Sequence, residues 1–426
     1  MTKHSTIEGM ITGGKFPGAF KPLVRAALPL LLASLFGASA VWADDEVPVK
    51  LLTTIPYPPD VHALHAFDIS WVDADTQLYY LGDRSNASVD VFDVKNNKFV
   101  KLIKAGFTGV VFNAAGAANN DKSGPNGVVV SGRWLFVTDA PSRVVAIDLT
   151  TDTEVSEVNT GGAPGLRADE MAYDSRDGLI LAVNNADDPP FASLIKADNG
   201  HLSIVKRITF DAAHGVDASN GAEQPVWDRG TDSFYISIPQ VGPNLEDGAV
   251  ARINPHSGEV DALFPVKFCQ PGGLTLGPKQ DLLIGCSVVF DTAGNGWKAA
   301  DPNSAAPTQV ILDARNGSID RFVAGVGGSD EVWFNHGDER YYTASRNNPT
   351  GPVLGVIDAK KQSLVQIVPT VNSAGKANVF PAGTAHSVAV NSQNNHALVP
   401  LPANNVVPNC LHGCIGVYGT PHHDDD

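Results

Sequence analysis

The sequence predicts an all-β fold, a β-propeller of seven four-stranded antiparallel blades, on three observations. Short runs of Val, Ile, Leu, Phe and Tyr alternate with turns rich in Gly, Pro, Asn and Asp, and no long stretch has helical periodicity. A pattern of four such runs repeats along the chain, which is typical of a closed repeat fold. The last repeat lacks its fourth run, and a segment near the N-terminus supplies one.

Each repeat begins with a polar residue or Gly, followed by apolar residues and a polar turn. The seven segments of this form are "DISWVD" from Asp68, "NGVVVS" from Asn126, "DEMAYD" from Asp169, "EQPVWD" from Glu223, "GGLTLG" from Gly272, "DEVWFN" from Asp330 and "HSVAVN" from His386. We predict that each segment forms the innermost strand of one blade. Their first residues, called the ring heads below, should then meet at the mouth of the central channel.

Three further runs complete each repeat. A second strand such as "WLFVTD" follows a short turn, and a third such as "VVAID" usually closes on an acid. Tight turns such as Asn199-Gly200 and Ser257-Gly258 come next and supply the positive φ of hairpins. A fourth strand such as "EVSEVNT" ends the blade.

The seventh repeat stops after its third run, "CIGVYG". Residues 49–58, "VKLLTTIPYP", read like the missing fourth strand, so we predict that the mature N-terminal strand closes the ring. Closure would remove the open sheet edges that invite aggregation. A ring of six blades with one degenerate repeat is the alternative.

The start of the chain predicts export. Lys15, Lys21 and Arg25 precede an apolar run that ends in "VWA" before the acidic "DDE", as in a secretory signal peptide. We predict a signal peptide over 1–43, a single propeller domain over 44–420 and a C-terminal tail over 421–426, in a periplasmic or extracellular protein. Cleavage after Ala40, translation from Met10 and a retained anchor are the alternatives.

The charge of the chain limits its partners. Removing residues 1–43 takes away four basic residues and one acid, so the formal charge of −16 becomes about −19. Such a surface repels nucleic acid and anionic lipid, which excludes both as partners of the mature chain. A small molecule is the expected partner, and the sequence leaves the oligomeric state open.

Four cysteines in an exported chain indicate disulfides. Cys410 and Cys414 could close a small loop, and Cys269 and Cys286 could bridge neighbouring strands. Metal thiolates are the alternative.

The ring heads predict a metal centre. Four carboxylates (Asp68, Asp169, Glu223, Asp330), the amide of Asn126 and the imidazole of His386 would converge there. Ca²⁺ prefers about 6–8 such oxygens, and a single His leaves Mn²⁺, Fe²⁺ or Zn²⁺ open. In the alternative interpretation these side chains cap strands, bond backbone amides or face channel water. Glu170 and Glu331, one position further on, either contribute or point into their blades.

Three strands carry a family resemblance. "AEQPVWDRGTDSFYIS", "GPNGVVVSGRWLFVTD" and "ADEMAYDSRDGLILAV" resemble motifs of the senescence marker protein/gluconolactonase family. The resemblance implies that Glu223, Asn126 and Asp169 bind one divalent cation, which opens a lactone with the help of a neighbouring acid. In that family the Glu strand comes first and the ring has six blades, unlike here. The repeats as a whole resemble YVTN-type seven-bladed propellers, many of which only bind.

The leading hypothesis is a metal-dependent enzyme, either a lactone or ester hydrolase or a metal-assisted lyase or isomerase, with Asp169, Asp330 or His386 as acid or base. The competing class is a non-catalytic propeller that binds a protein or glycan through its long connections, such as 106–125, 211–222 and 287–307. Other candidate residues are Arg84 and Arg346, which could orient an anionic substrate or pair with an acid; His62 and His65, as substrate groups; and Trp71, Trp227 and Trp333, as packing between blades.

Overall fold

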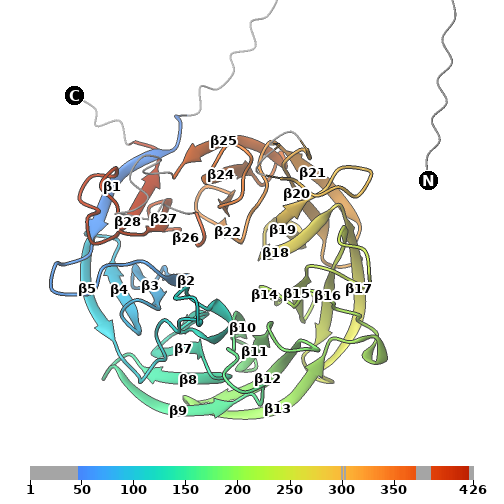
Figure 1. The fold of residues 1–426 in the computed structure, drawn as a ribbon, viewed down its shortest axis with the longest axis horizontal. Coiled ribbons are helices and arrows are strands. Elements are labelled where there is room, and N and C mark those ends of the chain that lie inside the picture. The colour runs from blue at the N-terminus through green and yellow to red at the C-terminus, as the bar shows by residue number, and fades with distance from the viewer. Residues whose placement is uncertain (1–46, 299–300, 302–303, 371–384, 422–426) are drawn as a thin grey trace, which may run out of the picture. The chain divides into compact units, whose positions relative to one another are not determined.

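The computed structural model describes residues 47–298, 301, 304–370 and 385–421. These residues form seven four-stranded antiparallel sheets arranged as the blades of a ring (Figure 1). The prediction of a seven-bladed propeller is therefore confirmed, and the alternative of six blades is wrong. No helix in the described ranges has the length and apolar character needed to cross a membrane. The predicted signal peptide and almost all of the predicted tail lie outside the described residues.

The first four blades follow one another along the chain. Blade 1 contains β2 (Phe67–Asp73), β3 (Leu78–Asp83), β4 (Ser88–Asp93) and β5 (Lys98–Ile103). Blade 2 contains β6 (Val128–Ser131), β7 (Trp134–Asp139), β8 (Arg143–Asp148) and β9 (Thr153–Asn159). Blade 3 contains β10 (Met171–Asp174), β11 (Leu179–Asn184), β12 (Phe191–Asp198) and β13 (His201–Thr209). Blade 4 contains β14 (Pro225–Asp228), β15 (Ser233–Ile238), β16 (Asp247–Asn254) and β17 (Glu259–Lys267).

The remaining three blades complete the ring. Blade 5 contains β18 (Cys269–Leu276), β19 (Asp281–Val289), β20 (Thr308–Asp313) and β21 (Ile319–Ala324). Blade 6 contains β22 (Glu331–Asn335), β23 (Arg340–Ser345), β24 (Val353–Asp358) and β25 (Ser363–Pro369). Blade 7 contains β26 (Ala389–Asn391), β27 (His396–Leu401), β28 (Cys414–Gly419) and β1 (Lys50–Pro56). Single 3₁₀ turns are η1 (Asn120–Lys122), η2 (Ala212–His214) and η3 (Pro278–Gln280).

The hydrophobic core lies between neighbouring blades. The second and third strands of a blade are buried on both faces, as in β15, where every residue is buried. Tyr80 and Val91 of blade 1, for example, join Val130 and Leu135 of blade 2 in one buried cluster. A strand that is buried on both faces has apolar residues at successive positions, which is why its apolar run in the sequence is unbroken.

The N-terminal strand closes the ring as predicted. β1 pairs antiparallel with β28, from Lys50 opposite Gly419 to Pro56 opposite Cys414. The side chain of Ile55 is fully buried in the cluster shared by blades 7 and 1. The backbone groups along one edge of β28, the last strand of the described chain, are thus paired with those of β1, the first.

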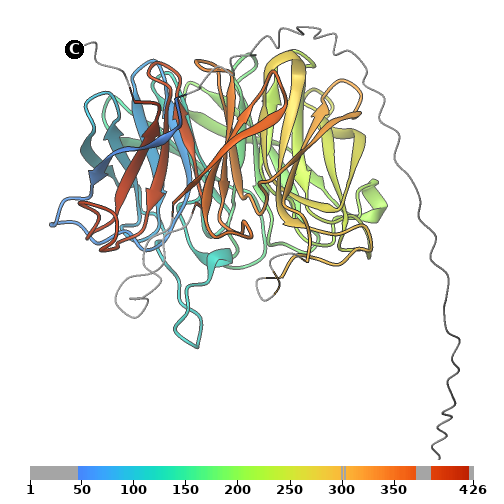
Figure 2. The ribbon, with the colours of Figure 1, turned by 90° about the horizontal axis from the view of Figure 1, so that it is seen from above.

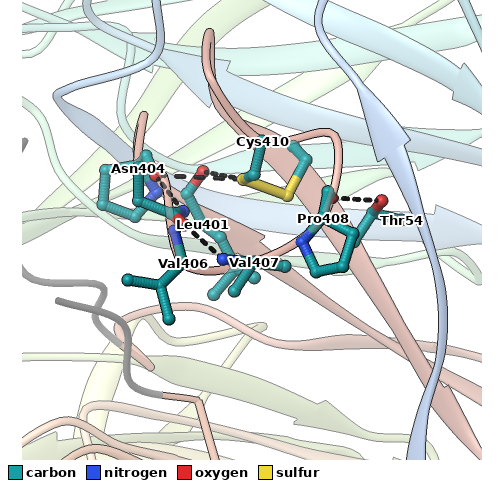
Figure 3. The surroundings of a disulfide bond; sticks show 9 residues. Thr54, Leu401, Asn404, Val406, Val407, Pro408 and Cys410 are labelled. Atoms are coloured by element: carbon teal, nitrogen blue, oxygen red, sulfur yellow. Dashed lines mark hydrogen bonds between the residues drawn. A yellow bond between two sulfur atoms is a disulfide. The ribbon is translucent and has the colours of Figure 1, made fainter.

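Both predicted disulfides are present, and no cysteine is free. Cys269–Cys286 joins β18 to β19, and Cys410–Cys414 ends the connection between β27 and β28 (Figure 3). In that connection the side chain of Asn404 accepts hydrogen bonds from backbone N–H groups, and the Thr54 hydroxyl donates to the Pro408 carbonyl at 2.9 Å. The closing strand is therefore tied to the connection as well as to β28.

The connections have different lengths on the two faces of the ring. Turns from first to second strands are short, such as residues 74–77, whereas residues 104–127 between β5 and β6 form a long loop that extends from the opposite face (cyan in Figure 2). We call this second face the long-loop face. It carries the ring heads, because each head lies within three residues of the start of its inner strand, after a connection on this face.

The closure can be tested by deletion. A chain that begins at Pro59 lacks β1 and leaves the β28 edge and the apolar side of blade 7 open, so it should aggregate or melt well below a chain that begins at Asp44. Thermal melting followed by circular dichroism, with light scattering, measures both outcomes. Equal melting curves for the two chains would contradict the closure.

Candidate functional site

The ring heads are held at the channel mouth by backbone pairing with the second strands. The N–H groups of Asp169, Glu223 and Asp330 donate to carbonyls of the neighbouring second strand at 2.7, 2.9 and 3.0 Å. The sheets thereby extend past the formal start of each inner strand. The position of each head is thus fixed by its own blade.

Two glycines let neighbouring inner strands approach closely at the mouth. A Cβ atom at Gly127 would lie 2.8 Å from the carbonyl oxygen of Asp169, and one at Gly273 would lie 2.5 Å from that of Asp330. Both distances are shorter than real Cβ contacts, so a side chain would push the blades apart. These glycines bring the heads of adjacent blades within reach of each other.

The heads line a polar pocket of about 120 Å³ at the mouth, called the mouth pocket below. Its side chains are five of the six predicted ligands, one neighbouring glutamate, three arginines and one asparagine. They are Asp68, Asp169, Glu223, Asp330, His386, Glu170, Arg84, Arg167, Arg346 and Asn120. Asn126 is buried beside this pocket without lining it.

The carboxylate of Asp68 is the centre of an ion-pair network. It pairs with Arg84, with Arg167 at 3.3 Å and with the Nε2 atom of His386 at 2.8 Å. Burial alone would raise the pKa of Asp68, but these three cations hold it well below its usual range. The network joins the end of β3, the connection before β10 and the head of β26, so three blades meet at one carboxylate.

The amide of Asn126 is fully used within this network. Its Oδ1 atom accepts from the Nε and Nη2 atoms of Arg84 at 3.1 and 2.7 Å, and its Nδ2 group donates to the Ala168 carbonyl at 2.7 Å. An oxygen that faces a guanidinium is in an unfavourable position to bind a cation.

The imidazole of His386 lies between two carboxylates. Its Nε2 atom faces Asp68, and its Nδ1 atom lies 2.5 Å from Oδ2 of Asp330. Burial lowers the pKa of His386, but Asp330 and Asp68 together raise it to about 9, so the ring is an imidazolium at neutral pH. Asp330 also contacts Arg346 at 3.2 Å, and these cations lower its pKa despite its burial.

Two other heads hold protons near neutral pH. Burial raises the pKa of Asp169 to about 7, although the Nη2 atom of Arg167 lies 2.7 Å away. Burial, with the nearby charges of Asp169 and Asp330, raises the pKa of Glu223 to about 8. Both carboxyls can therefore exchange protons in the physiological range.

The predicted divalent cation does not fit this arrangement. Asp68 and Asn126, two of its six expected ligands, are already occupied by arginines. In the described parts of the chain, no three His, Cys, Asp or Glu side chains are grouped so that they could hold a metal ion. The negative charge of the heads is balanced by guanidinium groups instead.

Arg167 is the functional candidate that the sequence interpretation missed. It precedes the head Asp169 by two residues, and a cation so close to an acidic head is the signal that could have found it. Arg84 and Arg346, for which two roles were open, both pair with acids of the network. His62 and His65 do not line the mouth pocket. The three predicted packing tryptophans do pack against the clusters between blades, and they also line the channel.

Comparison with known proteins supports the fold and no more. The chain matches no known family profile, and a search of curated proteins finds no match. Among solved structures it is similar to Kuenenia stuttgartiensis hydrazine synthase, with a TM-score of 0.60 and 12% sequence identity. That similarity covers 82% of this chain and 96% of the other. At this identity it establishes a common propeller fold and carries no information about function.

The central role of Asp68 predicts a large loss of stability on substitution. Asp68→Asn removes the partner of Arg84, whose side chain is only 3% exposed, and should lower the free energy of unfolding by about 3–5 kcal/mol. Urea unfolding followed by fluorescence measures this loss. Glu259→Gln, which breaks the exposed pair of Glu259 with Lys206, is the control and should cost less than about 1 kcal/mol. Equal effects of the two substitutions would show that Asp68 is not the centre of the network.

The same pKa shifts predict how stability depends on pH. His386, Asp169 and Glu223 all have a raised pKa in the folded state, so each stabilises the fold fully below its unfolded pKa. These contributions are lost as pH rises toward about 7 for Asp169, about 8 for Glu223 and about 9 for His386. The free energy of unfolding should therefore fall from pH 6 to pH 9.

Urea unfolding at the two pH values measures this fall. Glu223→Gln imitates the protonated side chain and should make the fall smaller. A protein that is as stable at pH 9 as at pH 6 would exclude the raised pKa values.

Proposed function

We propose that the mouth pocket is the active site of a secreted enzyme that acts on a small acidic molecule by general acid–base catalysis. The reaction classes that need only an acid and a base are lactone or ester hydrolysis and the lyase or isomerase reactions. One observation carries the proposal: Asp169 and Glu223, whose pKa values burial raises to about 7 and about 8, line one small polar pocket together with three arginines.

The charge of the pocket supports an acidic substrate. At neutral pH it holds four cations, namely three arginines and the imidazolium of His386, against the two fully ionised carboxylates of Asp68 and Asp330. This local surplus of positive charge lies in a chain whose formal charge is −16. The side chain of Arg346 is 39% exposed and is the cation best placed to meet a carboxylate from solvent.

The two titrating carboxyls take separate roles in the proposal. Asp169, with a pKa of about 7, is the base that removes a proton from water or from a carbon beside a carbonyl. Glu223, with a pKa of about 8, is the acid that protonates the leaving oxygen. Asp330 and His386 hold each other in an ion pair, so we assign them to positioning rather than to proton transfer.

The proposal contains no metal step. The resemblance to the senescence marker protein/gluconolactonase family implies a cation on Glu223, Asn126 and Asp169. Here Arg84 occupies the oxygen of Asn126, so we assign the balancing charge to the arginines.

A binding propeller is the second candidate, because large apolar side chains are exposed on connections of the long-loop face. These side chains are Phe112, Leu245, Val406 and Leu411, with exposed fractions of 53–65%. They favour contact with a partner protein at this face.

Substitution of the two carboxyls tests the enzyme proposal. The mature chain is incubated with a panel of small lactones, esters and hydroxy acids that carry a carboxylate, and turnover is followed by NMR. Asp169→Asn and Glu223→Gln should each lower kcat by about 10²–10⁴-fold, the usual contribution of one acid or base. Glu259→Gln, far out on β17, should leave kcat unchanged, and all three variants should remain folded.

A chelator separates this proposal from a metal-dependent reaction. Treatment with EDTA should change neither turnover nor Tm. A loss of turnover together with a lower Tm, both restored by adding Ca²⁺ or Mn²⁺, would instead indicate a cation at the heads. A protein that turns over nothing in the panel would favour the binding propeller.

A further inference from the structure

A second cavity lies in the central channel, beside the mouth pocket. It has a volume of about 350 Å³ and is lined by the inner strands of six blades, which surround the centre of the ring in Figure 1. We call it the channel chamber. Aromatic side chains make up much of its wall: Trp71, Tyr173, Trp227, Trp333 and Phe334. The exposed His336, past the end of β22, lines its opposite end, so the chamber reaches the face of the short turns.

The chamber is acidic at its inner end. Glu170 and Glu331 line it there, and Glu170 also lines the mouth pocket. No lysine or arginine is among the described residues that form its wall. The chamber wall therefore lacks guanidinium groups, whereas three arginines converge in the mouth pocket.

Each of these glutamates has an oxygen without a partner among the described residues. The Oε2 atom of Glu331 accepts from the Ser387 hydroxyl and from the Val388 N–H at 2.9 Å, which leaves Oε1 unpaired. The Oε2 atom of Glu170 is also unpaired. The side chains belong to residues that are only 1% and 9% exposed, and buried polar atoms of this kind normally have a partner.

We propose that the channel chamber binds an organic amine, with its ammonium group at Glu170 and Glu331 and its apolar body among the indole rings. An ammonium supplies several N–H donors, enough for both unpaired oxygens, whereas an alcohol supplies one. An anionic ligand would meet no cation in this wall.

Two features of the wall support a cation with an apolar body. The faces of indole rings attract cations, and Trp71 and Trp333 pack edge to face with their ring centroids 5.1 Å apart. Separately, no lysine or arginine accompanies the two glutamates in the described wall, so an ammonium group would be the cation that pairs with them. The volume falls within the range of small-molecule sites.

Isothermal titration calorimetry with three matched probes tests the proposal on the wild-type mature chain. The probes are 2-phenylethylamine, 2-phenylethanol and 3-phenylpropionate, which share an aromatic body and differ in the charge of the polar end. The amine should bind at least tenfold more tightly than the alcohol, and the carboxylate should not compete with it. Equal binding of amine and alcohol, or no binding of the amine, would overturn the proposal without any variant.

Substitution then locates the site. Glu331→Gln keeps an acceptor for Ser387 and Val388 but removes the charge, so it should weaken amine binding at least tenfold and alter alcohol binding less than twofold. Melting curves show whether Glu331→Gln is folded. If it is unfolded, Glu170→Gln is used instead to test the loss of amine binding. Glu223→Gln, in the mouth pocket only, is the matched control and should bind the amine normally.

An amine affinity that Glu331→Gln and Glu170→Gln leave unchanged would overturn the assignment. The result is independent of the proposed enzyme, because Glu223→Gln should lower kcat by about 10²–10⁴-fold and leave amine binding intact.

Discussion

The pairing of β1 with β28 is the constraint on which the rest of the structure depends. Seven blades can surround a channel only if the last blade also meets the first, and blade 7 has its outer strand only because the N-terminal segment provides it. Burial of Ile55 and the hydrogen bond from Thr54 to Pro408 then fix that strand in place. Closure in turn sets the distance between opposite inner strands. The meeting of Asp68 from blade 1 with His386 from blade 7 is a direct product of it.

The second organising feature is the way in which the heads balance their charge. Several carboxylates converge at the mouth because each inner strand begins with a polar residue, and such a group is unstable without cations. A divalent ion is one solution. Here guanidinium groups from the connections lie among the carboxylates, and the result differs chemically, because the carboxylates differ in how many cations they contact. Asp68 has three partners and is ionised, whereas Glu223 has few and retains its proton, so neighbouring acids acquire different proton affinities.

The sequence was a good guide to the backbone and a partial guide to the site. The repeat from Asp68 to His386, the closing strand and both disulfides could be predicted, because they follow from periodicity, loop length and cysteine spacing along the chain. The convergence of five heads also follows from the repeat. Arg167 could not be placed in the same way, because it lies outside the repeat in a connection whose path has no periodic signal. The sequence therefore predicted the acids, the amide and the imidazole of the mouth, but not the guanidinium that lies among them. Nor could the unpaired oxygens of Glu170 and Glu331 be foreseen, since they depend on how side chains turn within the channel.

The order of the strands along the chain has a consequence for how the protein reaches its native state. Lys50 and Gly419 are neighbours in the sheet but lie at opposite ends of the described sequence. Closing a loop over such a separation has a large entropy cost. The pairing of β1 with β28 stabilises the fold only after all intervening blades have formed. A chain that is synthesised from its N-terminus produces β1 first and β28 last. Until β28 is made, β1 has no partner strand, so the ring closes in one late step. The chain is most exposed to association with other chains just before this closure.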